Sequence, residues 1–428
     1  MLRAPIGRRR LLKSAMAALS AAIVSPAVRA QANGPRIVVV GGGFGGAACA
    51  RALRRADPHL TVTLVEANRT YTASPMSNAV IAGLRDLSQQ QFGYDKLGHD
   101  GITVALSAAS AIDPHGRTIT LADGTRLAYD RLILSPGIDF RWGAIQGYDE
   151  AAAALMPHAY KGGDQIALLR RQLESMDDGG LVAISAPVNP ARCPPAPYER
   201  ASLIAYYLKR RKPRSKIVIF DAKDTFAMHE LFEEAWKALY PGLIEWRAVG
   251  NDGLVNSVEP QTRTLVTDFD KYKAAVANVI PPQKAGHVAE LAGVADRTGW
   301  CPVDPVTFES KLQANIHVIG DAAIAGAMPR AASAAQVQGE ICANAIAALL
   351  AGKTPAAPTL TSSCFSLIAP DYAISQRSTF RPKDGQYEES PPGIGIVVSP
   401  RNAAPAVRSG EAKEADAWFA QITAAVFG

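Results

Sequence analysis

The 428-residue sequence predicts an α/β fold with two Rossmann-like units and a smaller C-terminal α+β part. Two strand–loop–helix patterns, at residues 36–55 and 179–210, indicate the two units. A third buried-strand pattern, at residues 315–321, leads into a long helix and indicates that the chain returns to the first unit. The composition, 48% hydrophobic and 20% charged, is that of an ordinary globular protein and excludes a disordered or collagen-like chain.

The first thirty residues have the pattern of an export signal. A twin-arginine motif, Gly7–Lys13, precedes the apolar run Ala15–Val24 and the small residues Ala30–Ala32. The apolar run is too short for a membrane anchor, which must cross about 30 Å of hydrocarbon, and no other segment of the sequence is long enough. We therefore expect residues 1–30 to be a twin-arginine signal peptide, and the mature protein to be periplasmic and without a transmembrane segment.

The charge balance and the cysteine spacing indicate whether nucleic acid, a metal ion or a disulfide is expected. Six of the 45 Lys and Arg residues lie in the signal, and the remaining 39 balance the 39 Asp and Glu residues, so nucleic acid is not an expected partner. The five cysteines have no metal-ligand spacing, and we expect no metal site. An oxidising compartment does permit one specific disulfide.

The start of the mature chain carries a dinucleotide-binding motif. The strand Arg36–Val40 leads into a glycine turn and then into the helix Ala47–Arg55. Gly41 permits the tight turn, Gly43 lets the backbone approach a pyrophosphate, and Gly46 lets the helix pack closely on the strand.

An acid follows at the expected distance from this turn. Glu66 ends the second predicted strand, Thr61–Val65, twenty residues after Gly46, and a carboxylate there can accept hydrogen bonds from ribose hydroxyls. The alternative is a glycine-rich turn that binds no ligand, but it gives no reason for an acidic residue at this distance. We therefore expect a bound dinucleotide.

Two later motifs decide which dinucleotide is bound. The strand ending in Gly320 and Asp321, with the helix from about residue 331 to 350, resembles the flavin motif of the glutathione reductase and ferredoxin reductase group. The turn that ends at Gly137 resembles the point where the chain of that group leaves its FAD domain. The resemblance implies that Asp321 binds FAD and that the helix N-terminus stabilises the negative charge of reduced flavin.

The second unit lacks a nucleotide-binding loop. Between the predicted strand, residues 179–185, and the predicted helix, residues 198–210, residues 186–197 contain five prolines, one cysteine and no glycine. Proline has no backbone N–H and cannot adopt positive φ, so this loop cannot cradle a pyrophosphate. A reductase that depends on NAD(P)H is therefore disfavoured, and we expect the loop to present Cys193.

These patterns together give the domain organisation. We expect residues 31–155 and 280–352 to form an FAD-binding domain in two parts, within a fold of the glutathione-reductase type. Residues 156–279 form the second unit, and residues 353–428 form a C-terminal α+β interface domain.

Several long strings resemble the flavoprotein subunit of flavocytochrome c sulfide dehydrogenase, over essentially the whole mature chain. They are Cys193-Pro194-Pro195, Pro197–Ser202, Ile280–Gln283, Gly299–Asp304, Thr307–Ser310 and His317–Asp321. The resemblance implies an FAD enzyme that oxidises sulfide and passes electrons to a c-type cytochrome subunit that carries haem. This chain has no CxxCH motif, so it does not bind that haem itself.

The resemblance also implies the catalytic residues. Cys193 and Cys301 are expected to form a redox-active disulfide against the flavin, with Trp300 as an apolar wall beside it. Glu199 is expected to act as a general acid or base, although a carboxylate that only favours the helix dipole is an equal alternative. Cys49, Cys342 and Cys364 are expected to be structural.

One position departs from the family pattern. Some members attach FAD covalently through a cysteine, and Ser74 stands at that position here. A hydroxyl is a poorer nucleophile than a thiolate, so we expect FAD to be bound without a covalent link.

Two other functions remain open. A sulfide:quinone oxidoreductase would need a membrane-binding tail, whereas residues 411–427 are expected to pack on their own domain. A non-catalytic flavoprotein that relays electrons would not need the cysteine pair.

Overall fold

The computed structural model describes residues 34–391 and 394–428. The predicted twin-arginine signal at residues 1–30 lies outside the described residues. Within the described residues, no helix combines the length and the apolar character that crossing a membrane requires.

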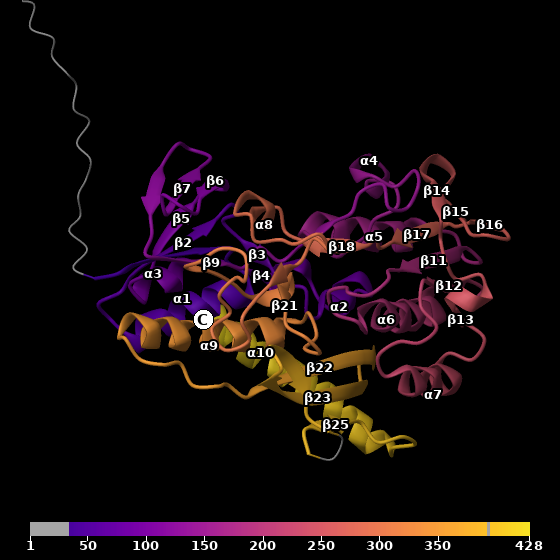
Figure 1. The fold of residues 1–428 in the computed structure, drawn as a ribbon. Helices are drawn as coiled ribbons and strands as arrows, with labels where there is room; N and C mark the ends of the chain where they lie inside the picture. Colours follow the sequence, from indigo (N-terminus) through magenta and orange to yellow (C-terminus); the bar gives the residue numbers. More distant parts are fainter. Residues whose placement is uncertain (1–33, 392–393) are drawn as a thin grey trace, which may run out of the picture. The chain divides into compact units, whose positions relative to one another are not determined.

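The first sheet has five parallel strands in the order β20-β9-β1-β2-β5. Figure 1 labels β2, β5 and β9 of this sheet. The strands are β1 (Arg36–Val40), β2 (Thr61–Glu66), β5 (Thr103–Leu106), β9 (Arg131–Leu134) and β20 (Ile316–Val318). β1 is central and almost fully buried, as its run of β-branched residues predicts. β20 comes from far along the chain and completes this sheet beside β9.

Two helices cover this sheet and pack against each other. α1 (Phe44–Ala56) follows the glycine turn, and α9 (Ala332–Leu350) follows the strand that closes the sheet. Their backbones come so close that a Cβ at Gly339 would lie 3.1 Å from the backbone nitrogen of Cys49. The small residues of both helices make this approach possible.

The second sheet has four parallel strands in the order β13-β12-β11-β17. They are β11 (Leu181–Ala186), β12 (Lys216–Asp221), β13 (Ile244–Arg247) and β17 (Val276–Val279). Its helices are α5 (Gly163–Ser175), α6 (Ala196–Arg211) and α7 (His229–Leu239). α6 begins two residues before the position that the sequence indicates, because Pro195 is its N-cap and proline suits the start of a helix.

The C-terminal part is an antiparallel sheet with one long helix. β22 (Leu360–Ala369), β23 (Tyr372–Lys383) and β24 (Gln386–Glu389) are consecutive, and β25 (Ile396–Val398) pairs with β23. The helix α10 (Pro405–Phe427) buries Phe419, Ile422 and Val426. Its packing against β23 and α1 confirms that residues 411–427 pack on the protein itself.

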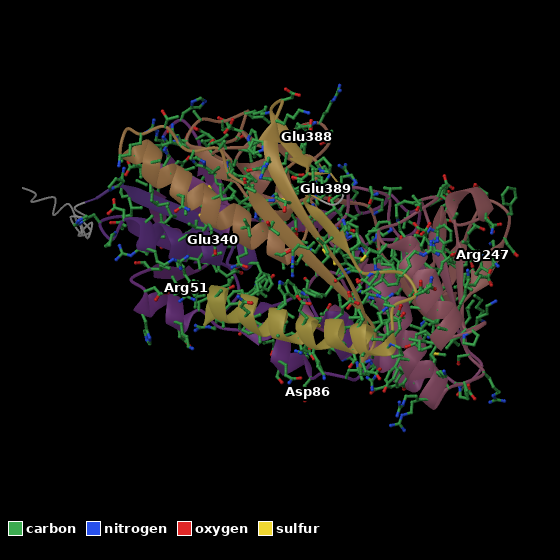
Figure 2. All side chains as sticks on the ribbon, turned by 90° about the horizontal axis from the view of Figure 1, so that it is seen from below. Arg51, Asp86, Arg247, Glu340, Glu388 and Glu389 are labelled. Carbon is green, nitrogen blue, oxygen red and sulfur yellow. The ribbon has the colours of Figure 1, made fainter. Side chains whose placement is uncertain are left out.

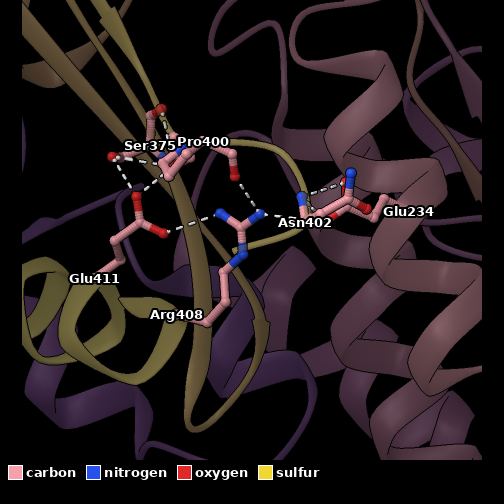
Figure 3. A network of polar contacts seen from close by, with 7 residues as sticks. Glu234, Ser375, Pro400, Asn402, Arg408 and Glu411 are labelled. Atoms are coloured by element: carbon pink, nitrogen blue, oxygen red, sulfur yellow. Dashed lines mark hydrogen bonds and ion pairs between the residues drawn. The ribbon is translucent and has the colours of Figure 1, made fainter. Parts of the chain in front are cut away.

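Two arginines fix α10 at its ends. At the C-terminal end, Arg51 donates hydrogen bonds to the carbonyls of Ala425 (3.0 Å) and Gly428 (2.7 Å), beside the helix in Figure 2. At the N-terminal end, Arg408 has a side chain only 1% exposed and forms ion pairs with Glu234 of α7 and Glu411 of α10 (Figure 3). The C-terminal part is thereby joined to both Rossmann-like units.

The remaining elements are short. They are β3 (Tyr71–Thr72), α2 (Ser77–Ile81), η1 (Leu87–Gln90), β4 (Gln91–Phe92), α3 (Asp95–His99), β6 (Ala109–Asp113), β7 (Thr118–Leu121), β8 (Arg126–Ala128), β10 (Ile138–Phe140), α4 (Glu150–Ala153), η2 (Val249–Asn251), β14 (Ser257–Glu259), η3 (Pro260–Thr262), β15 (Thr264–Val266), β16 (Lys271–Lys273), β18 (Gln283–Ala285), α8 (Val288–Leu291), β19 (Cys301–Pro302), η4 (Gly320–Ala322) and β21 (Ala323–Ile324). The α/β fold with two Rossmann-like units is confirmed.

Candidate active site

A cavity of about 960 Å³ lies where the first sheet, the second unit and the C-terminal sheet meet. All the residues expected to bind FAD, except Gly46, line its walls. It lies beyond the carboxyl ends of the parallel strands, which is where open α/β sheets bind their ligands.

The glycine turn has the geometry that the sequence predicts. Gly41 has φ +100° and donates its N–H to the carbonyl of Val65 at 2.9 Å. A Cβ at Gly46 would collide with the carbonyl oxygen of Gly41, so the helix can follow the turn only if this residue is glycine. Gly43 is the N-cap of α1 in an ordinary extended conformation, and a Cβ there would lie 3.3 Å from the ring of Tyr71, so glycine permits the close approach of that ring rather than a turn.

Glu66 lies at the end of β2 and points back to this turn. Its Oε2 accepts a hydrogen bond from the N–H of Gly42 at 2.8 Å, and its Oε1 accepts one from the N–H of Asn68 at 2.9 Å. The carboxylate is thereby held at the cavity wall, where the ribose of a dinucleotide is expected.

The other flavin motif lies across the cavity. Gly137 and Gly320 both have positive φ, at +65° and +74°, and both line the cavity with Asp321. The Oδ2 atom of Asp321 accepts a hydrogen bond from Nε of Arg192 at 2.6 Å. The N-terminal end of α9 also faces this space, and its first turn contains no acidic residue that would cancel the helix dipole.

The residues therefore fit FAD. The strand–turn–helix cradle suits a pyrophosphate, Glu66 suits a ribose, and the positive end of α9 suits a group that becomes anionic on reduction. Ser74 also lines the cavity, so a serine is present at the position where some family members attach the flavin.

Cys193 lies in the proline-rich loop and lines the same cavity. It has a positive φ of +49°, and its N–H donates to the carbonyl of Arg330 at 2.7 Å. Burial raises the pKa of the Cys193 thiol well above its usual value, and Cys364, Glu199 and Asp321 add to this effect. A thiol so placed is kept protonated unless a positive charge or a disulfide relieves it.

Cys364, rather than Cys301, shares the cavity with Cys193. Cys364 comes from β22 of the C-terminal sheet, and burial, with a contribution from Glu199, raises its pKa to about 11. All five cysteines are free thiols in the structure.

The structure does not bring Cys301 to Cys193. Cys301 is fully buried in β19, which pairs with β21, and it does not line the cavity. Burial, then Asp296, raises its pKa to about 12, and neither Cys193 nor Cys364 contributes. The structure therefore places Cys364, and not Cys301, in the cavity with Cys193, so its geometry does not support the expected pairing of Cys193 with Cys301.

Trp300 is also displaced from its expected position. It is buried beside Cys301, lines a second pocket instead of the first, and lies 4.0 Å below the guanidinium of Arg330. The indole that lines the cavity with Cys364 is instead Trp418, whose ring centroid lies 5.7 Å from that of Phe365, the residue after Cys364.

Glu199 lies in the first turn of α6, is only 7% exposed, and lines the cavity with both cysteines. Burial raises its pKa to about 7, against smaller opposing contributions from Leu367, Asn78 and Arg200. Because Glu199 also raises the pKa of Cys193 and Cys364, it lies within electrostatic reach of both thiols. A carboxyl group with this pKa can give or take a proton near neutrality.

A buried arginine supports this region. Arg200 follows Glu199 and donates hydrogen bonds to Asn78 Oδ1 (3.0 Å), Asn278 Oδ1 (2.8 Å) and the carbonyl of Ala159 (2.7 Å). These contacts connect α6 to α2 and β17. They hold the first turn of α6, and with it Glu199, in a fixed position.

Sequence reasoning missed four residues of the cavity: Cys364, Arg192, Tyr160 and Trp418. The sequence did offer a signal for Arg192, because it is a basic residue directly before Cys193 in a loop that contains no glycine. Cys364 had no such signal, because only the three-dimensional fold brings β22 to the loop that carries Cys193.

Family models match three parts of the chain. "Sulfide dehydrogenase [flavocytochrome c] flavoprotein chain, central" matches residues 166–281, and "Flavocytochrome c sulphide dehydrogenase, flavin-binding" matches residues 356–427. "Pyridine nucleotide-disulphide oxidoreductase" matches residues 35–167. The flavin-binding model covers both Cys364 and Trp418.

Sequence relatives and solved structures agree with these matches. The mitochondrial sulfide:quinone oxidoreductase of Mus musculus is 24% identical over 301 residues, 68% of this chain and 66% of the relative, so the match spans just under two thirds of that protein. The structure of the sulfide:quinone oxidoreductase from Aquifex aeolicus has a TM-score of 0.73 at 17% identity, with 92% of each chain covered. The ferredoxin reductase from Rhodopseudomonas palustris has a TM-score of 0.61 at 17% identity, with 83% of this chain and 91% of the other covered. These structures confirm the fold.

One relative is much more similar over a short length. The sulfide dehydrogenase [flavocytochrome c] flavoprotein chain of Chlorobaculum thiosulfatiphilum is 58% identical over 45 residues, which are 10% of this chain and 94% of the relative. Together with the central and flavin-binding models, this match shows that the chain belongs to the family of flavoprotein chains of flavocytochrome c sulfide dehydrogenase.

Proposed function

We propose that this protein is an FAD-dependent oxidoreductase that oxidises sulfide and passes the electrons to a c-type cytochrome subunit. The observation that carries the proposal is the presence of Cys193, Cys364 and Glu199 in the cavity that also holds the flavin motifs. Two thiols and a carboxyl group beside a flavin site provide the groups for disulfide exchange.

The first step is thiol–disulfide exchange. In the oxidised protein Cys193 and Cys364 are joined by a disulfide, and hydrosulfide attacks one of the two sulfur atoms. The S–S bond breaks, a new S–S bond forms to the incoming sulfur, and one cysteine becomes a persulfide while the other leaves as a thiolate. FAD, when bound, supplies a two-electron acceptor that can release electrons singly to a haem.

Glu199 donates a proton in this step and then accepts another. Burial disfavours a thiolate at either cysteine, so the leaving sulfur needs a proton or a positive partner. With a pKa of about 7, Glu199 is protonated in a large fraction of molecules at neutral pH and can donate that proton. The carboxylate that remains can accept the proton of the next hydrosulfide.

Three further features belong to this proposal. FAD is held without a covalent bond, because Ser74 offers a hydroxyl in place of a thiol. Residues 1–30 direct export by the twin-arginine route, so the protein works in the periplasm. The haem that accepts the electrons is supplied by a separate cytochrome polypeptide.

Anaerobic titration with sulfide tests the proposal. The purified protein should lose its flavin absorbance in proportion to added sulfide, and the Cys193→Ser and Cys364→Ser variants should not. A Cys301→Ser variant is the matched control and should respond like the wild type. Retention of sulfide-dependent bleaching in both cavity variants would refute the disulfide mechanism.

A quinone is the second candidate for the electron acceptor. The similarity to the mitochondrial sulfide:quinone oxidoreductase over 301 residues favours it. Sulfide-reduced protein should reoxidise rapidly with a c-type cytochrome and slowly with a short-chain quinone. The opposite order of rates would assign the protein to the quinone-dependent enzymes.

A further inference from the structure

A second pocket, of about 480 Å³, lies behind the loop that carries Cys193. Its walls come from the proline-rich loop, from Arg141 after β10, from β18 and the residue before it, from the turn before β19, and from β21 and the segment that follows it. It does not share a lining residue with the cavity of the flavin motifs. The pocket therefore needs its own explanation.

Two arginines give this pocket a positive charge. Arg141 is exposed at its rim and donates to the carbonyls of Gln283 (3.2 Å) and Thr298. Arg330 donates from Nε to the carbonyl of Asp321 at 2.8 Å. No carboxylate of the described residues forms an ion pair with either guanidinium, and the pocket has no acidic lining residue. Both guanidinium groups can therefore bind a ligand, although the carboxylate of Asp321, which pairs with Arg192, acts electrostatically on Arg330.

An amide N–H donor without a partner lies in the same pocket and also indicates a bound ligand. Gln283 is 97% buried and lines the pocket, and its Oε1 accepts the N–H of Arg192 at 2.8 Å. Among the residues that the structure describes, its Nε2 has no hydrogen-bond partner. A buried N–H without a partner is costly, so such a group indicates a ligand that accepts its hydrogen bond.

The remaining wall is apolar. The buried indole of Trp300 lies under the guanidinium of Arg330, and Val188 and Ile324, which are 41% and 37% exposed, stand at the rim. A polarisable, weakly hydrated atom suits this wall better than an oxygen that requires hydrogen bonds. The pocket thus offers charge and N–H donors on one side and an apolar surface on the other.

We propose that this second pocket binds a small sulfur oxyanion, with its oxygens at Arg141, Arg330 and Gln283 Nε2 and its terminal sulfur against Trp300. The assignment of a sulfur compound rests on the proposed function, whereas the anion site rests on the pocket alone. The ligand would lie next to the loop of Cys193, because the Cys193 N–H donates to the carbonyl of Arg330 and the Arg192 N–H to Gln283.

Calorimetric titration with thiosulfate tests this proposal. The FAD-loaded protein should carry Cys193→Ser, so that binding is measured without thiol chemistry and does not depend on sulfide oxidation. We expect one site, weakened roughly tenfold or more by Arg330→Gln and by Gln283→Glu, since each removes a charge-assisted hydrogen bond. Gln283→Glu keeps the acceptor for Arg192 and replaces the N–H donor with a negative oxygen.

Arg141→Gln at the exposed rim leaves the Arg330 side chain and Gln283 Nε2 in the pocket, and it should also weaken binding. Arg126→Gln, an equal loss of charge on an exposed strand, should leave the affinity unchanged. Sulfate should bind more weakly than thiosulfate, because it lacks the terminal sulfur.

The outcomes separate the two proposals. Absence of binding, or equal affinity in the three pocket variants and in Arg126→Gln, would overturn the anion site. Equal affinity for sulfate and thiosulfate would overturn the sulfur assignment. If wild-type protein does not react with sulfide but thiosulfate binding depends on the pocket as expected, the site stands and the proposed function fails.

Discussion

Arg192 and Asp321 form an ion pair, with 2.6 Å between Nε and Oδ2, across the cavity of the flavin motifs. The pair joins the proline-rich loop of the second unit to the motif that follows β20. Arg192 also donates to the carbonyl of Tyr160 at 3.1 Å, and Gln283 accepts its backbone N–H. The proline-rich loop is therefore fixed against the flavin motifs, and Cys193 is fixed with it.

Replacing Arg192 by methionine should lower stability and weaken flavin binding together. The side chains of Arg192 and Asp321 are 19% and 11% exposed, so the substitution leaves a mostly buried carboxylate without its partner, at a cost of about 3 kcal/mol. Urea unfolding and the ratio of flavin to protein after gel filtration measure both effects. In the Asp321→Asn background the same substitution should cost much less, and an equal cost in both backgrounds would show that the pair is not coupled.

The pKa of Glu199 predicts how stability depends on pH. The folded pKa of about 7 lies above the ordinary value of 4.5, so between these values the native state binds more protons than the unfolded state. The free energy of unfolding should therefore fall as pH rises from about 4.5 to 7, by about 3 kcal/mol in order of magnitude from this residue.

Glu199→Gln should remove that part of the pH dependence, because the amide resembles the protonated acid. Urea unfolding at several pH values between 5 and 8 measures it, with Glu150→Gln, at an exposed position, as the control. Parallel stability curves for the wild type and Glu199→Gln would mean that the pKa is not raised.

Arg408 should contribute far more to stability than an arginine in an exposed ion pair. It is 1% exposed, accounts for both ion pairs at the N-terminal end of α10, and donates to the carbonyl of Pro400 at 2.7 Å (Figure 3). Replacement by alanine leaves the carboxylates of Glu234 and Glu411 without their cation, and we expect a loss of about 3–5 kcal/mol.

The matched control is Arg401, which pairs with Glu230 at 2.7 Å while their side chains are 61% and 73% exposed. Arg401→Ala should cost no more than about 1 kcal/mol. Urea unfolding of the two variants measures the contrast, and similar losses would contradict the structural role of Arg408.

The flavin should be released by acid. Ser74 lines the cavity but provides no thiolate, so FAD should appear in the supernatant when the protein is precipitated with trichloroacetic acid. A yellow pellet that keeps its flavin after washing would contradict non-covalent binding.

The local parts of the site could be predicted from the sequence because each depends on a short segment. The glycine turn with Gly41, the acid Glu66, and Gly320 with Asp321 all lie on the elements that their patterns indicate. Glu199 was placed correctly at the start of a helix next to Cys193 for the same reason.

The proposed partner of Cys193 could not be predicted in this way. The family resemblance implied Cys301 as the partner, and the local pattern agreed, because Cys193 and Cys301 both precede a proline in apparent loops. The actual neighbour, Cys364, lies within the long strand β22, where the alternation of side chains gives a cysteine no distinctive signal. Only the packing of the C-terminal sheet on α6 and α9 brings Cys364 to the cavity.

The central claim is that Cys193 and Cys364 are the redox pair. Disulfide mapping by mass spectrometry tests it most directly, on protein purified without reductant, alkylated, and digested before and after anaerobic addition of sulfide. The account predicts a peptide pair linked through Cys193 and Cys364 that disappears with sulfide, while Cys301 is alkylated as a free thiol once the protein is unfolded. A link between Cys193 and Cys301, or free thiols at Cys193 and Cys364 in protein that still reacts with sulfide, would contradict it.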